Sequence, residues 1–164
     1  MPAVARGTPT GNTVRLNYNT ATYGTPTWVQ IGKINKESLE RGKKTYFKSA
    51  VREAQKEIQQ EGVLEPDKAS FNYRRAKGIT DTVWTAILAA AAQGAAPMDL
   101  FFADDLASLS GATGRRGFFS ITIGKEPRDL GAFVEHEIEA NEVEHYETVG
   151  GVATLIQAQE YTVP

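Results

Sequence analysis

The sequence contains no cysteine and only two histidines among its 164 residues. No disulfide and no thiolate chemistry is therefore available. A metal site of imidazole and carboxylate groups would need His136 and His145, which lack the fixed spacing of metal-binding motifs. We expect His136 to pack with one ring nitrogen satisfied and His145 to be solvated near Glu142, Glu144 and Glu147, with no metal and no cofactor bound.

Long apolar runs are also missing. The longest, residues 86–92, is far too short to cross a bilayer, so no membrane insertion is expected. The first residues, MPAVARGTPTGNTV, lack the apolar core of a signal peptide. We expect a soluble protein made in the cytosol, and its length suits one domain with a real core.

Catalytic motifs are lacking as well. No serine stands in a Gly-x-Ser-x-Gly frame, and Gly111 and Gly114 do not open a strand-to-helix phosphate loop. We therefore interpret residues 108–116 as a flexible surface loop. The basic pairs 74–75 and 115–116 lack the interleaved aromatic residues of a nucleic-acid stacking surface, and solvated strand ends explain them as well. On the residues alone we expect no enzyme.

What the sequence does have is a glutamate at nearly every second residue between 133 and 147. A period of two predicts a β-strand over 133–140, with Glu135, Glu137 and Glu139 on one face and Val134 and Ile138 on the other. Carboxylates roughly 7 Å apart repel by about 0.6 kcal/mol per neighbouring pair, so folding gains nothing from this row. An acidic wall facing another charged body and an ordinary solvated strand face both fit the pattern.

Charge is distributed unevenly along the chain. Residues 33–77 hold twelve lysines and arginines against seven acids, whereas from Asp129 onward there are eight acids and no lysine or arginine. Opposite patches favour head-to-tail association between copies. Chance in a mixed surface explains the same asymmetry.

Alternating apolar residues and turn signals predict further strands. These are expected at residues 13–18, 28–34, 69–75, 98–103, 117–123 and 151–157. Phe119, Ile121 and Ile123 are expected to face the core. Residues 36–43 are interpreted as a charged connection and residues 125–131 as a turn.

One helix is predicted over residues 81–93, DTVWTAILAAAAQ, with Asp81 or Thr80 as the N-cap and Gly94 as the stop. This segment is apolar on nearly all sides, so all its faces need cover, either from a sheet alone or from a sheet together with another subunit. The candidates for that packing or interface are Trp84, Leu88, Ala89 and Ala91, where the alanines permit close backbone approach.

Residues 46–60 fit two structures. Apolar residues at positions 47, 50, 51, 54 and 58 have helical spacing, which predicts an amphipathic helix ending at Gly62. Divided in two, residues 45–51 and 56–61 fit a pair of strands joined by a tight turn. On periodicity alone the helix is favoured.

The order of these elements resembles the tail tube proteins, or major tail proteins, of bacteriophages and prophages. The resemblance covers roughly residues 23–146. It rests on the Trp-Val-x-Ile-Gly strand at 28–32, the Phe71 and Tyr73 strand and the Thr-Asp-Thr-Val-Trp-x-x-Ile helix at 80–87. A small-residue break at 91–97, paired strands across a Gly-rich loop, Lys-Glu-Pro at 125–127 and the acidic strand complete it.

The resemblance implies a mainly β fold with one packed helix, in two antiparallel sheets that form a sandwich or half-barrel. Residues 1–22 would be an N-terminal arm with a short strand and residues 23–164 a single tail-tube-like β domain. Six subunits would form a ring whose shared inner barrel is acidic, and rings would stack into a tube. The implied partners are other copies, the tape measure protein and genomic DNA in the lumen, and tail terminator and distal tail proteins at the ends. The chain would then reside in the virion, after synthesis in the host bacterial cytoplasm.

The resemblance also bears on residues 46–60, because tail tube proteins have a long β-hairpin there. We therefore expect the hairpin, since a short helix gains most of its stability from tertiary packing. Residues implied for the inner barrel or the contact between rings are Lys44, Lys48, Arg52, Lys56, Glu57 and Glu61. For the acidic lumen we expect Glu135, Glu137 and Glu139 first, with Glu53, Glu57 and Glu61 as competitors.

Three other interpretations stay open. The chain could be another ring-forming virion component, such as a neck or tail terminator protein, or the tube of a contractile injection machine. A monomeric β-barrel that binds a small apolar ligand, with the alanine-rich helix as a lid, is the alternative outside virions.

Overall fold

Twelve strands and one helix make up the described part of the chain in a computed structural model, which describes residues 15–51, 56–76, 78–107, 109–124 and 133–164. For residues 46–51 and 56–61 the description is of the backbone. The expected arm at 1–11, the turn at 125–131, Arg52 and Glu53 lie outside the described residues. The fold is mainly β with one helix and antiparallel sheets, as the resemblance implies.

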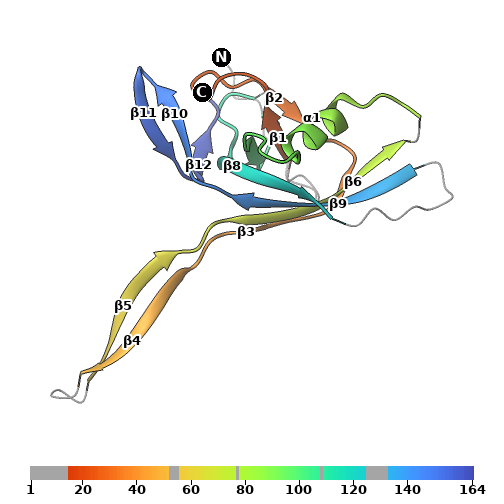
Figure 1. Cartoon of the computed structure of the whole chain (residues 1–164). Helices are drawn as coiled ribbons and strands as arrows, with labels where there is room; N and C mark the ends of the chain where they lie inside the picture. Colours follow the sequence, from red (N-terminus) through yellow and green to blue (C-terminus); the bar gives the residue numbers. More distant parts are fainter. Residues whose placement is uncertain (1–14, 52–55, 77, 108, 125–132) are drawn as a thin grey trace.

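The main sheet has eight strands (Figure 1). Seven follow one another in the order β2-β1-β7-β8-β9-β6-β3, and β12 pairs with β8 beside this path. Each of these strand pairs is antiparallel. The bounds are β1 Arg15–Asn19, β2 Trp28–Gln30, β3 Ile34–Glu40, β6 Lys68–Ala76, β7 Met98–Ala103, β8 Thr113–Ile123, β9 Phe133–Glu142 and β12 Gln159–Thr162. Within the described residues, β2 and β3 are the two edge strands at the ends of this order.

The core lies on the face of the sheet that carries the helix. Buried residues of the five strands β1, β6, β7, β8 and β9 meet there, and the largest fully buried ones include Tyr73, Phe71, Phe119 and Leu100. Phe119 and Ile121 are buried and Ile123 packs against the cluster, as predicted. Strand β7 is buried on both faces, since Phe101 and Ala103 pack on the opposite side against Trp28 and Tyr161.

The helix, α1, runs from Thr82 to Ala90 and begins as predicted at Asp81, whose carboxylate accepts a hydrogen bond from the Trp84 N–H at 3.1 Å. It ends three residues before the expected Gln93. The N–H of Ala92 bonds to the Ala89 carbonyl at 3.3 Å, which tightens the last turn before Gly94 at φ 75°. Among the described residues, no helix is long and apolar enough to cross a membrane.

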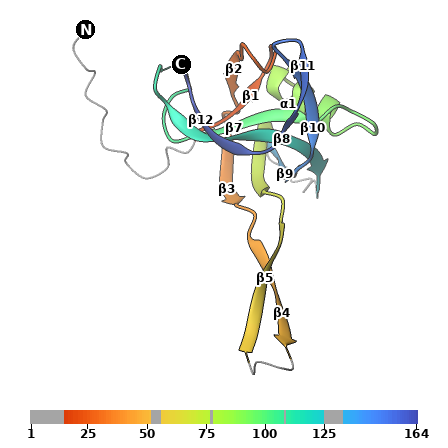
Figure 2. The ribbon, with the colours of Figure 1, turned by 90° about the vertical axis from the view of Figure 1, so that its left-hand side faces the viewer.

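Residues 46–60 belong to a β-hairpin. Strands β4 (Lys44–Val51) and β5 (Lys56–Leu64) pair antiparallel, with Val51 opposite Lys56 and Lys44 opposite Leu64. This confirms the choice made from the resemblance against the helical periodicity. The hairpin continues the β3–β6 pair and projects away from the rest of the molecule (Figures 1 and 2).

Two predictions for the first half of the chain are wrong in detail. The strand expected at 28–34 ends at Gln30, because the chain turns at Lys33, which has φ 61°. The connection expected at 36–43 is mostly β3, an edge strand on which Lys36 and Glu40 are exposed and Glu37 is half-buried. A β-bulge between Asn35 and Ser38, with Lys36 at φ 51°, interrupts its register with β6.

The second half departs from the predictions in two places. Residues 113–116, expected in a loop, form the start of β8, because β7 and β12 pair with them on either side. The strand expected at 151–157 is confirmed as β11 (Val152–Ile156), but it pairs with an unpredicted partner, β10 (His145–Val149). Positive φ at Gly150 and Gly151 forms the turn between them.

Candidate assembly surfaces

The acidic row occupies the face of the main sheet opposite α1. Along β9, Val134, His136, Ile138 and Ala140 are buried, whereas Glu137 and Glu139 are exposed and Glu135 is half-buried. The predicted division of this strand into an apolar and an acidic face is confirmed. What the acidic face meets in an assembly stays a prediction.

Uncharged polar side chains and a few basic groups surround the three glutamates. The Ser38 and Ser70 hydroxyls on β3 and β6 lie 2.8 Å apart, and Asn72 donates to Glu135 at 2.6 Å. Arg74 is paired with Glu135 across β6 and β9 and lies over the Phe133 ring. Glu137 and Glu139 are paired across β6 with the uncharged Asn72 and Ser70.

The buried face of β9 shows why His136 lies in the core. Its ring stacks on Trp84 at 3.9 Å between centroids, and Arg75 donates from Nε to His136 Nε2 at 3.0 Å. The prediction of a packed His136 is confirmed. His145 was expected in solvent, but it is half-buried because Phe118 packs against it at 4.2 Å and Glu147 lies 3.1 Å from its Nε2.

The hairpin candidates are spread along both projecting strands. Lys44 begins β4 and is exposed, Lys48 is paired with Gln59, and Lys56 begins β5 opposite Val51. Glu57 is paired with Ala50 and Glu61 with Tyr46. Arg52 lies outside the described residues.

The helix candidates divide between core and surface. Trp84 is buried and stacks between Tyr73 and His136, and Ala91 is half-buried against the core. Leu88 is 46% exposed and Ala89 is exposed, so the outer side of α1 has no cover within the described part of the monomer. Ala89 also lines a cleft of about 740 Å³ between α1, the 19–23 loop and β10.

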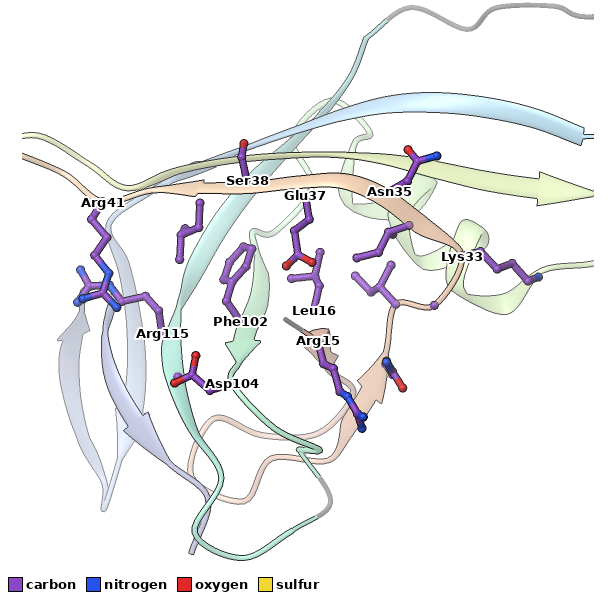
Figure 3. A pocket seen from close by; sticks show the side chains of 16 residues that line it. Arg15, Leu16, Lys33, Asn35, Glu37, Ser38, Arg41, Phe102, Asp104 and Arg115 are labelled. Atoms are coloured by element: carbon purple, nitrogen blue, oxygen red, sulfur yellow. The ribbon is translucent and has the colours of Figure 1, made fainter. Parts of the chain in front are cut away.

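A second cavity, of about 830 Å³, opens beneath the edge strand β3 (Figure 3). The bulge turns Glu37 inward, so that its carboxylate lies between Leu16 and Phe102, while Arg41 and Arg115 lie at one end. Burial raises the pKa of Glu37 to about 7, and its Oε1 is shielded from solvent with no hydrogen-bond partner among the described residues. Sequence reasoning missed this residue because residues 36–43 were interpreted as a charged connection.

A buried ion pair was also missed. Arg116, interpreted as a solvated strand end, is 1% exposed and donates from Nη2 to Asp99 Oδ2 at 2.6 Å. The rings of Tyr23, Trp28 and Tyr161 surround its guanidinium at 3.8 to 4.9 Å. A signal existed in the sequence, because Asp99 is the single charge in the MDLFFA strand and a buried carboxylate needs a partner.

No protein family model and no curated protein matches this chain. Among solved structures, it is similar to a chain from the baseplate of the anti-feeding prophage, determined by cryo-electron microscopy with six-fold symmetrisation. The TM-score is 0.45 at 11% sequence identity, and the alignment covers 99% of this chain and 97% of that chain.

Proposed function

We propose that this chain is a structural subunit of a phage-type tail tube. Copies join into rings of six, rings stack into a hollow tube, and the acidic face of β9 lines the bore through which DNA passes. The element order that resembles tail tube proteins supports the proposal, and the projecting hairpin is the observation that carries it.

The hairpin gives the monomer strand edges that other copies can pair with. A two-stranded hairpin is marginally stable in water, and each of its outer edges offers a row of backbone N–H and C=O groups. Strands β4 and β5 have eight and nine residues, and in the described chain they pair with each other in a sheet of their own. Strands of neighbouring copies would complete those edges, and the open edges at β2 and β3 would be covered in the same way.

The acidic face of β9 would let DNA slide through the bore of the tube. Phosphates are repelled by a bore lined with carboxylates on all sides, so DNA slides and does not adhere. Glu137 and Glu139 supply this repulsion best, because no basic residue is paired with either across β6. Arg74, opposite Glu135, gives that end of the row a weaker field.

Electron microscopy of the purified protein tests the assembly. We expect rods or stacked rings for the parent chain, and a monomer when residues 45–63 are replaced by Asn-Gly between Lys44 and Leu64. As a control, replacing Gly150-Gly151 by Asn-Gly in the other hairpin should leave the rods intact. A parent chain that stays monomeric at high concentration would overturn the proposal and favour a small-ligand protein with the 830 Å³ cavity as its site. Single rings that never stack would favour a neck or terminator role.

Charge reversal tests the bore. Replacing Glu135, Glu137 and Glu139 by lysine should leave rings intact but make them retain DNA in a gel-shift assay at low salt. The matched control reverses the exposed Glu40, Asp104 and Glu144 instead. Equal DNA retention by both triple variants would show that the β9 glutamates do not face the bore.

A further inference from the structure

The hairpin leaves the body through two short crossings, residues 41–43 and 65–67, which we name the root. Few backbone contacts hold these crossings together. The backbone N–H of Glu65 donates to the Lys43 carbonyl at 3.1 Å, and a Cβ at Gly42 would collide with the Glu65 carbonyl oxygen, so the crossings touch. A two-stranded ribbon held by its own ladder alone would swing about such a root.

Asp67 ties the root to the main sheet. It is 1% exposed although the neighbouring Glu65 and Pro66 are exposed. Its Oδ1 accepts from the Gly42 N–H at 2.8 Å, on the other crossing, and its Oδ2 accepts from Arg115 Nε at 2.7 Å, on β8. One buried carboxylate therefore joins both crossings to a central strand.

Two further glutamates extend this connection to the end of the chain. Glu142 of β9 accepts from the Asp67 N–H through Oε2 and from the Ala158 N–H through Oε1, both at 2.7 Å. Glu160 of β12 lies 2.9 Å from Arg41 and 4.0 Å from Arg115. Three strands outside the root, β8, β9 and β12, thus hold it from different directions.

The exposed fractions of the side chains show which of the two ion pairs restrains the root more strongly. The Asp67 and Arg115 side chains are 2% and 17% exposed, whereas Arg41 and Glu160 are both above 60%. Exposed ion pairs contribute little, while a charge-assisted bond between shielded groups is strong and directional. Of the two ion pairs at the root, the one between Asp67 and Arg115 is therefore the stronger restraint.

We propose that Asp67 and Arg115 are positioning residues that fix the direction in which the β4–β5 hairpin leaves the body. The ion pair presents the hairpin in one orientation before any copy binds. Binding then loses less conformational entropy than it would with a swinging arm. This last step rests on the proposed function; the fixed direction itself does not.

Spin labels measure the direction of the hairpin within a single chain. Because the sequence has no cysteine, Gln59→Cys and Ser120→Cys create two unique labelling sites, one on the hairpin and one on β8. Labelled protein is diluted with unlabelled protein, so that double electron–electron resonance reports distances within one chain. We expect a narrow distance distribution for the parent and broad ones for Asp67→Asn and Arg115→Met.

Arg41→Gln is the matched control, because it removes a cation from the same root but only an exposed contact. It should keep the narrow distribution. A folded Asp67→Asn or Arg115→Met with the parent's distribution overturns the proposal. If neither folds, Arg115→Lys decides, since it keeps the charge and loses the Nε donor: broadening supports the proposal and a parent-like distribution overturns it.

The assembly assay separates this inference from the proposed function. If the parent forms rods, folded Asp67→Asn should need about tenfold more protein to do so, equivalent to about 1.4 kcal/mol. If the parent forms none, the tail tube proposal fails, while the spin-label distances still decide whether Asp67 and Arg115 fix the hairpin.

Discussion

Arg116 Nη2 lies 2.6 Å from Asp99 Oδ2, and both side chains are buried. Arg116 also donates to the Tyr23 carbonyl at 2.9 Å, and Asn19 donates to Asp99 at 2.9 Å. Together with the ring of Tyr161, these contacts join the end of β1, the loop that follows it, β7, β8 and β12 around one guanidinium.

Breaking this pair should therefore be costly. We expect Arg116→Met to lower the free energy of unfolding by about 3–5 kcal/mol, because Asp99 is left buried without its counter-charge. Urea denaturation followed by tryptophan fluorescence measures the loss. The exposed Arg74→Met serves as the control and should cost about 1 kcal/mol or less. Similar losses for the two variants would contradict a structural role for the Arg116–Asp99 pair.

The sequence predicts best where burial differs between the two sides of an element. Strand β9 has one buried and one solvated face, so its alternation alone placed Glu135, Glu137 and Glu139 opposite Ile138. The hairpin projects away from the body (Figure 1), so packing against the body does not impose a pattern on residues 46–60. Its helical periodicity was therefore misleading, and the order of elements was the better guide.

The features that the sequence did not predict depend on contacts between residues far apart in the chain and on local irregularities of the strands. Burial of Arg116 depends on Asp99 and on three rings from separate segments, none adjacent in sequence. Strand β3 lies at the edge of the sheet, where polar and charged side chains remain exposed, so its sequence resembles that of a charged connection. The inward turn of Glu37 depends on a bulge, which no alternation pattern displays.

The N-cap of α1 supplies a second prediction. Asp81 accepts from the Trp84 N–H, from the Tyr73 hydroxyl at 2.7 Å and from Lys33 at 3.2 Å. Burial would raise the pKa of Asp81, but these hydrogen bonds outweigh it and the pKa is lowered. Asp81→Ala should cost about 2–4 kcal/mol, from the cap and the Tyr73 bond together.

Thermal unfolding with circular dichroism checks this value. Thr80→Ala, at the alternative cap position, should change stability by no more than about 0.5 kcal/mol. Because the pKa of Asp81 is lowered on folding, its contribution is present above its unfolded pKa of 3.8 and is lost as pH falls. A cost for Asp81→Ala that does not shrink under acid conditions would argue against a charged cap.

Substitutions at two alanines near the end of α1 distinguish an effect on folding from an effect on assembly. Ala91 packs against the core, so Ala91→Phe should destabilise the monomer by about 1–3 kcal/mol through overpacking. Ala89 is exposed, so Ala89→Phe should leave the melting temperature of the monomer unchanged and block assembly if this face meets another subunit. Melting curves and electron microscopy of both variants give the two measurements. Parent-like rods from Ala89→Phe would place this side of α1 outside the interface.

The carboxyl of Glu37 should make stability fall as pH rises. Its pKa is raised from 4.5 to about 7 by burial, so the folded state holds a proton that the unfolded state has released. Its stabilising contribution is complete below pH 4.5 and is lost as pH rises through about 7. Because the side chain is only half-buried, solvent screening reduces the expected loss to about 1–2 kcal/mol.

Glu37→Gln keeps the shape of the side chain and removes the titration. We expect urea midpoints of the parent to fall between pH 5 and pH 8, and those of Glu37→Gln to stay nearly level over the same range. The control variant is Glu144→Gln, at an exposed position. Its urea midpoints should fall with pH as those of the parent do, because the substitution leaves the cavity beneath β3 unchanged. If Glu37→Gln falls as steeply as the parent, the pH dependence arises elsewhere, and the inward carboxyl is not the group that links protonation to the stability of the β3 edge.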